Sequence, residues 1–227
     1  MGGDFLFDII SRPFGALLRI IFDFTGNYGY AIILFTIFTR ILLLPINIKQ
    51  TQSTKKMNEL NPKIKEIQTK YKNNPEKMNQ ELMKLYKEHN YNPAAGCLPA
   101  LIQLPIIIAL FGVLQNPTKF VFTPEEFDAI AKGFLWLADL GKPDQLYILP
   151  VLSAVTTYLQ TAMLSAKGNV DPSMKTMNIV LPLMIGYFTL KFPSGIALYW
   201  VVGNIFTIIQ QYIMKGNAAL GSKGGEK

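Results

Sequence analysis

Several kinds of residue are scarce in this sequence, and each scarcity excludes a class of protein. The chain has one cysteine, Cys97, and one histidine, His89, which excludes a disulfide framework and argues against a zinc site. Charged residues make up 16% of the 227 residues, whereas ordinary globular domains average about 25%. Half of the residues are hydrophobic and the mean hydropathy is +0.24, so the chain is not intrinsically disordered. These properties indicate a polytopic membrane protein.

Long apolar runs are what the sequence has instead. At 1.5 Å per residue, the run 28–48 gives a helix of about 32 Å, enough for a hydrocarbon core of about 30 Å. The run 177–190 gives only about 21 Å, so we expect it to thin the bilayer locally or to depend on its neighbours. We predict an all-α membrane protein with five transmembrane helices, at 28–48, 97–115, 146–164, 177–190 and 195–214, within a core of residues 26–214.

The distribution of lysines predicts the orientation of the chain. Ten lysines lie between the first and second apolar runs, whereas the segment 116–145 has three lysines and five acids. Positively charged loops stay in the cytoplasm, which places 116–145 outside the cell. The short basic tail 215–227 is then cytoplasmic and the N-terminus is extracytoplasmic. The net charge of +7 is therefore interpreted as a topology signal rather than as a nucleic-acid-binding site.

Residues 1–25 have an amphipathic pattern. Apolar residues at helical spacing oppose charged residues such as Asp8 and Arg19, which predicts a helix lying in the extracytoplasmic interface of the membrane. A cleaved signal peptide is the alternative interpretation. The start Met1–Asp4 is not basic, and no small-residue cleavage site follows it.

The cytoplasmic segment 49–96 is predicted to form an antiparallel helical hairpin. Apolar residues recur at three- and four-residue steps on both sides of the turn Asn73–Pro75. Its role remains open between a solvated connector and a mobile basic platform for incoming chains. In the segment 116–145, Thr123–Glu126 has the pattern of a helical capping box. We expect the apolar residues after it, Phe127, Ile130 and Phe134, to face the membrane surface.

Arg40 is the most informative residue in the chain. It lies nine positions before Lys49, about 14 Å from the cytoplasmic end of the first run. A charge at the centre of a spanning helix costs about 2.5–3.5 kcal/mol on the insertion scale, so it normally faces a bundle interior or a wet cavity. None of the five runs contains Asp, Glu or His to pair with it. Arg40 is therefore predicted to be functional.

Uncharged polar residues suggest where Arg40 points. They follow helical spacing in the later runs, and each alone is best interpreted as a hydrogen bond between helices, worth about 0.6 kcal/mol on average. Together with an unpaired arginine they favour the lining of a water-filled groove. The residues are Ser153, Thr156, Thr157, Gln160 and Thr161 in the third run, Asn204, Thr207, Gln210 and Gln211 in the fifth, Gln103 in the second, and Thr36 and Thr39 in the first.

A groove of this kind restricts the possible functions. The missing acids argue against proton- or sodium-coupled transport, and no nucleophile–base set or metal motif indicates an enzyme. We expect no cofactor, and no phosphate-binding motif is present. A fixed cation could attract acidic residues of a passing peptide while its hydrophobic segment moves into lipid. A small transporter or channel with a cationic anion-binding site is the alternative.

Several runs of residues are informative when taken together. They are Thr39–Ile46, Asn92–Pro99 with Ile102–Ile106, Tyr147–Pro150, Phe192–Gly195, Ala197–Trp200, Asn204 and Ile208–Gln211. These runs resemble the YidC/Oxa/Alb family of membrane protein insertases. The resemblance covers about Tyr28 to Gln211, in the family's order, and is to the compact form of Gram-positive bacteria. This sequence differs from many such members in lacking a lipoprotein-type signal.

The resemblance implies a groove open to the cytoplasm and to lipid and closed on the outside. It implies that Arg40 engages acidic residues in the translocated tail of a substrate, and that Gln103, Gln160, Trp200 and Asn204 line the groove. It further implies a location in the bacterial plasma membrane. The implied partners are nascent membrane proteins and the lipid bilayer, with the secretory translocon and the ribosome as further candidates. A chaperone that only holds nascent segments beside a translocon is a third interpretation.

Overall fold

The computed structural model describes residues 2–92, 98–130, 133–164 and 172–223, and over these ranges the chain is helical apart from turns and one isolated β-bridge. This confirms the predicted all-α class. The helices are α1 (Gly2–Thr25), α2 (Tyr28–Leu42), α3 (Leu44–Lys70), α4 (Pro75–Glu88), α5 (Leu98–Gln115), α6 (Pro117–Phe120), α7 (Pro124–Ala129), α8 (Ile148–Leu164), α9 (Pro172–Thr189) and α10 (Ser194–Lys223).

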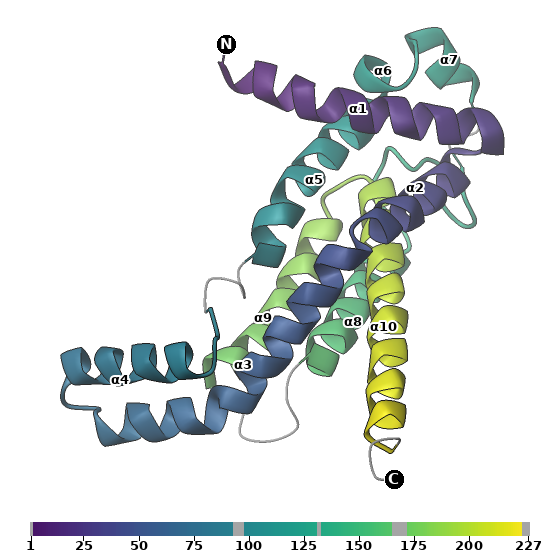
Figure 1. Cartoon of the computed structure of the whole chain (residues 1–227). Coiled ribbons are helices and arrows are strands. Elements are labelled where there is room, and N and C mark those ends of the chain that lie inside the picture. The colour runs from purple at the N-terminus through teal and green to yellow at the C-terminus, as the bar shows by residue number, and fades with distance from the viewer. Residues whose placement is uncertain (1, 93–97, 131–132, 165–171, 224–227) are drawn as a thin grey trace.

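The helices form a bundle with a cover at one end and an arm at the other (Figure 1). α8 packs against α9 and α10, α10 also packs against α2, and α1 packs against α2 and α5. α1 lies across one end of the bundle, beside the short helices α6 and α7, while α4 and the second half of α3 extend away from the opposite end (Figure 1). The two ends of the bundle are therefore built from different elements.

The described chain has one helix that is long and apolar enough to cross a membrane, or two such spans if a bent pair of helices is counted as one. One is the stretch Ser194–Met214 of α10, and the other is α2 together with Leu44–Ser53 of α3, taken as one bent pair. The remaining apolar helices are shorter, namely Leu104–Gln115, Ile148–Met163 and Asn178–Thr189. The number of five transmembrane helices and the orientation of the termini therefore stay predictions.

The first apolar run is a bent pair of helices rather than one straight helix. α2 ends at Leu42 and α3 starts at Leu44, with a bend of 58° between them. Pro45 lies in the first turn of α3. Backbone amides in the first turn of a helix have no hydrogen-bond partner within the helix, so the amide hydrogen that proline lacks costs no hydrogen bond there. A proline in the middle of a continuous helix would instead clash with the preceding turn. The bend follows Arg40 by three residues and places this arginine in the last turn of α2.

The main hydrophobic core fills the end of the bundle that α1 covers. Leu18 of α1, Ile32 and Phe35 of α2 and Val113 of α5 are fully buried there. Burial of each such side chain contributes about 1.5–3 kcal/mol relative to exposure. The connection between α7 and α8 adds Phe134, Leu137 and Leu140 to the same cluster. This end is tightly packed and mostly apolar, with the buried hydroxyls of Ser11 and Tyr28 as exceptions.

The apolar residues after α7 are buried in this core, contrary to the expectation that they face the membrane surface. The predicted capping box is present: the Thr123 hydroxyl accepts from the Glu126 amide, and the Glu126 carboxylate accepts from the Thr123 amide. Phe134, however, is 8% exposed and lies directly over Gly29, where a Cβ atom would come within 2.2 Å of the ring. Phe127 and Ile130 are partly buried against the same cluster. The local sequence pattern predicted the cap correctly. It could not predict the burial of Phe134, because the glycine against which this ring packs, Gly29, lies in α2.

The arm at the other end has a small core of its own. α4 packs against the second half of α3 through Leu60, Ile64, Leu85 and Tyr91. The Tyr91 hydroxyl lies 2.8 Å from the Met57 sulfur, which fixes the end of α4 beside α3. Pro62 lies inside α3, so the helix continues through Asn61–Pro62 and does not restart there.

Candidate functional site

Four residues named in the sequence analysis meet between α8 and α10, namely Thr156, Thr157, Trp200 and Asn204. The Thr157 hydroxyl oxygen accepts from the Trp200 indole at 3.0 Å and from the Asn204 amide at 2.9 Å. The same amide donates to the Thr156 hydroxyl at 3.0 Å. Thr156, Thr157 and Asn204 are all buried, at 8%, 4% and 5% exposure. We call these four residues the interhelical polar cluster.

Helical spacing explains why the interhelical polar cluster forms. Trp200 and Asn204 are four residues apart on α10, so they lie one above the other on the face toward α8. Thr156 also donates its hydroxyl hydrogen to the Leu152 carbonyl of the preceding turn at 2.7 Å, which leaves its oxygen free to accept from Asn204. Each of the four residues thus has at least one hydrogen-bond partner within the cluster.

Arg40 lies on the neighbouring face of α10. Its guanidinium carbon is 6.0 Å from the centre of the Tyr199 ring. A Cβ atom placed on Gly203 would come within 2.5 Å of one terminal nitrogen and 3.0 Å of Nε. Tyr199 and Gly203 each precede a member of the interhelical polar cluster by one residue, Trp200 and Asn204 respectively. The arginine and the cluster are therefore about 100° apart around one helix.

The electrostatic environment of Arg40 suits a cation that must also be available to a ligand. It lies in the last turn of α2, where the unpaired helix carbonyls carry partial negative charge. No ion pair joins it to a carboxylate in the described ranges, and its Nε is buried without a hydrogen-bond partner. The residue as a whole is only half-buried. A cation arranged in this way can pair with an anion without first breaking an existing ion pair.

Three of the five other buried polar atoms without a described partner lie on α8 and α10. These three are the Ser153 hydroxyl on α8 and the side-chain carbonyls of Gln210 and Gln211 on α10, and the remaining two are the hydroxyls of Ser11 on α1 and Tyr28 on α2. Most buried polar atoms in proteins have a partner, because leaving one unpaired costs about 1–3 kcal/mol. Their concentration on α8 and α10 extends the polar interior along these two helices.

The other predicted groove residues are less well defined by the structure. Gln160 is half-buried on α8, one turn beyond Thr157, and no described contact ties it to the cluster. The Gln103 side chain lies outside the described part of the chain. Sequence reasoning missed Tyr199 and Gly203, because an aromatic residue and a glycine in an apolar helix give no polar signal. It noted Thr156 only as one of several polar residues of the third apolar run.

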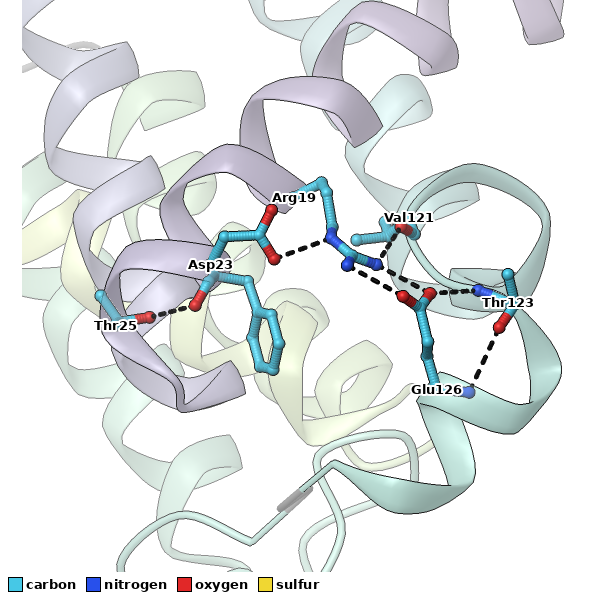
Figure 2. A network of polar contacts seen from close by, with 7 residues as sticks. Arg19, Asp23, Thr25, Val121, Thr123 and Glu126 are labelled. Carbon is cyan, nitrogen blue, oxygen red and sulfur yellow. Dashed lines mark hydrogen bonds and ion pairs between the residues drawn. The ribbon is translucent and has the colours of Figure 1, made fainter.

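A second charged site closes the end of the bundle that α1 covers (Figure 2). Arg19 of α1 donates to both carboxylate oxygens of Glu126 in α7, at 2.8 and 2.9 Å, and to Asp23 at 2.8 Å. Its guanidinium lies 5.3 Å from the centre of the Phe122 ring. The hydrogen bonds from Arg19 and from the Thr123 amide lower the pKa of Glu126 to about 2, so this carboxylate stays charged at any physiological pH.

The described residues place neutral hydrogen-bonding groups and one cation on neighbouring faces of α10. They contain no group of three or more His, Cys, Asp or Glu side chains that could hold a metal ion. The interhelical polar cluster consists of hydroxyl, amide and indole groups that do not titrate near neutral pH. What the site offers is one fixed cation beside neutral hydrogen-bonding groups.

A helical bundle with apolar outward faces and polar side chains meeting inside is the arrangement of an integral membrane protein. The outward faces of α8, α9 and α10 carry exposed apolar residues, among them Val151, Leu183, Tyr187, Ile209 and Ile213. The chain belongs to the family described as 60Kd inner membrane protein, which it matches over residues 20–220.

Similar proteins carry one name. The chain is 46% identical to "Membrane protein insertase YidC" of Clostridium perfringens over 203 residues, covering 86% of this chain and 81% of the relative. It is 44% identical over 204 residues to the protein of that name from Caldanaerobacter subterraneus, covering 90% and 93%. A solved structure titled "Active YidC insertase crystal structure with the first transmembrane domain resolved" superposes with a TM-score of 0.69 at 32% identity. The match covers 92% of this chain and 46% of that one. The resemblance found in the sequence is thereby confirmed.

Proposed function

We propose that this protein is a membrane insertase of the bacterial plasma membrane. It captures hydrophobic segments of newly made membrane proteins in a polar groove that contains Arg40 and releases them into the bilayer without hydrolysing a nucleotide. The observation that carries this proposal is the position of Arg40, half-buried and without a described carboxylate partner, one helix face away from the interhelical polar cluster. Relatives named as insertases support the same conclusion.

The proposed mechanism begins with charge capture. An acidic residue in the short translocated tail of a client pairs with Arg40, while Thr157, Gln160, Trp200, Asn204 and Gln103 give the groove around the tail a polar lining. At 4 Å and an effective dielectric constant of about 20, the attraction is about 4 kcal/mol before both charges lose water. Much of this attraction is offset by that desolvation, so the tail is held only briefly.

Burial of the client's apolar residues in lipid then drives release. The short apolar helix Asn178–Thr189 of α9 is about 18 Å long, so it favours a locally thinned bilayer that shortens the polar crossing. The tightly packed core under α1 keeps the extracytoplasmic end closed while the tail passes. In this scheme the arm formed by α3 and α4 is cytoplasmic and meets the client first, and the N-terminus lies outside.

The test uses purified protein in liposomes and a single-span client with an acidic N-terminal tail, and protease protection of the tail is measured. We expect protection with the unmodified protein and its loss with Arg40→Ala. Arg12→Ala is the matched control, because Arg12 is an exposed arginine of α1 outside the site. Protection no higher than in empty liposomes would exclude an autonomous insertase and favour a holding chaperone or a transporter. Saturable anion flux that changes with Arg40→Lys would favour a transporter.

A further inference from the structure

Gly203 lies at a position in α10 where glycine is unfavourable and its presence calls for a structural explanation. It is buried near the middle of the apolar stretch Ser194–Met214, and glycine weakens the interior of a helix relative to alanine. Close contact between helix backbones is the usual explanation for such a glycine, but it does not apply here. The three atoms nearest to a Cβ on Gly203 all belong to the guanidinium of Arg40, at 2.5, 3.0 and 3.1 Å.

Two other glycines in the same structure show the difference. A Cβ on Gly15 of α1 would meet the backbone carbonyl of Phe120 at 2.3 Å, so that glycine allows two pieces of backbone to approach. A Cβ on Gly186 of α9 would meet the Ala154 methyl at 3.1 Å, an apolar contact between α9 and α8. At Gly141 the nearest atom is a carboxylate oxygen of Asp139, at 3.1 Å, but that residue is only two positions away in the chain. Among the described glycines with close neighbours, Gly203 is the one where a charged group from another helix takes the place of a side chain.

We propose that Gly203 is a positioning residue for Arg40. With Tyr199 one turn before it, Gly203 forms a slot on α10 in which the guanidinium lies against the helix backbone and near the Tyr199 ring. Nε is buried in the slot and one terminal nitrogen lies closest to Gly203, while the residue as a whole stays half-exposed. In this proposal the exposed part of the guanidinium faces the client tail. This inference deepens the proposed insertase function and rests on it for its role.

The slot makes a specific prediction about substitutions. The atoms nearest to Gly203 are the far end of a flexible side chain, which can move aside without disturbing the backbone. Gly203→Ala should therefore fold normally while displacing the guanidinium, and Gly203→Val should exclude it from the slot. Both variants retain the charge of Arg40 and change only where it lies.

Nuclear magnetic resonance of the arginine side chains tests the position of Arg40 without any client. The chain has three arginines, Arg12, Arg19 and Arg40, so labelling arginine with ¹⁵N gives three Nε–H signals. The signal that is absent from the Arg40→Lys variant is that of Arg40. Gly203→Val is expected to shift the Arg40 signal and to speed its exchange with water, leaving the Arg12 and Arg19 signals in place. An unchanged Arg40 signal would overturn the positioning role whether or not the protein inserts clients.

The insertion assay then tests what this position does. Gly203→Val should lower insertion of an acidic-tailed client to the level of Arg40→Ala, and the double variant should be no worse than Arg40→Ala alone. A further loss in the double variant would show that Gly203 acts independently of Arg40 and would overturn the inference. Gly186→Val is the matched control: any loss it causes should be equal for acidic-tailed and neutral-tailed clients. If the unmodified protein inserts nothing, the proposed function fails while the spectroscopic result still decides the role of Gly203.

Discussion

Arg19 in α1 and Glu126 in α7 form a two-pronged ion pair, with nitrogen–oxygen distances of 2.8 and 2.9 Å, between residues 107 positions apart in the chain. Glu126 is at the same time the acid of the α7 capping box. One carboxylate therefore holds the start of α7 and attaches α7 to α1 (Figure 2). A second ion pair, from Lys119 to Asp8 at 2.7 Å, joins α1 to α6.

The Arg19–Glu126 pair should make stability depend on pH at acid values. The hydrogen bond from Arg19 lowers the pKa of Glu126 from 4.5 to about 2. A lowered folded-state pKa means that the ionised form stabilises the fold above about pH 4.5, and that this contribution is lost as the pH falls toward 2. We expect Glu126→Gln to have a lower Tm than the unmodified protein at neutral pH. This difference in Tm should shrink as the pH falls from about 4.5 to about 2. The effect should be small and should weaken with salt, because both side chains are at least one-third exposed to solvent.

Thermal unfolding in detergent, measured from pH 7 to pH 2, checks this prediction. Arg12→Ala serves as the control, since it removes an arginine of the same helix without touching Glu126. Parallel pH profiles for the unmodified protein and Glu126→Gln would contradict the proposed contribution of the pair.

Removal of the Thr157 hydroxyl should lower the free energy of unfolding more than removal of a single hydroxyl usually does. Its oxygen accepts from both Trp200 and Asn204, and Thr157→Val leaves the Trp200 indole hydrogen unpaired. We expect a loss of about 1–2 kcal/mol in the free energy of unfolding, above the average of about 0.6 kcal/mol for such bonds in membranes. Thr157→Ser keeps the hydroxyl and should be nearly neutral. The quantity to measure is reversible unfolding in mixed micelles.

A double variant separates the lost hydrogen bond from lost packing. Trp200→Phe removes the donor that Thr157→Val would leave unpaired, so the double variant should cost less than the sum of the two single variants. Strict additivity would show that the bond from Trp200 contributes little to the free energy of unfolding.

Asp144 should stabilise the start of α8. It is 3% exposed, and its two carboxylate oxygens accept from the Leu146 amide at 3.0 Å and the Leu149 amide at 2.8 Å. Asp144→Ala removes both acceptors and should cost about 1–2 kcal/mol, as loss of a helix cap does. Asp144→Asn retains one oxygen and should cost less. Equal destabilisation by Ala and Asn would indicate that the charge, rather than the hydrogen bonds, is what α8 requires.

Gly15 should be less tolerant of alanine than Gly203. A Cβ on Gly15 would meet a backbone carbonyl at 2.3 Å, and backbone cannot rotate away as a guanidinium can. We expect Gly15→Ala to lower the free energy of unfolding by about 1–3 kcal/mol, the usual cost of overpacking. Gly203→Ala should be close to neutral in the same unfolding experiment. The reverse order of the two variants would contradict the contacts described for both glycines.

The local sequence determined most of the secondary structure. Apolar runs specify helices because every backbone group in an apolar setting must find a partner within its own segment. The α7 cap was also predicted, because Thr123 and Glu126 act on backbone groups within a few residues of themselves. The bend at Pro45 was not, since the run 28–48 was expected to form one helix. The lone charge of Arg40 was also evident, since no acid shares its apolar runs.

Tertiary structure alone decided which of these elements meet. The sequence shows that Trp200 and Asn204 share a face of one helix, but only packing places Thr157 against them. Phe134 was expected at the membrane surface and lies instead over Gly29, because a glycine on another helix leaves room for its ring. Gly203 gave no sign of its contact with Arg40. Pairings of this kind depend on helix crossing and on many weak contacts summed over the bundle, and no stretch of sequence contains both partners.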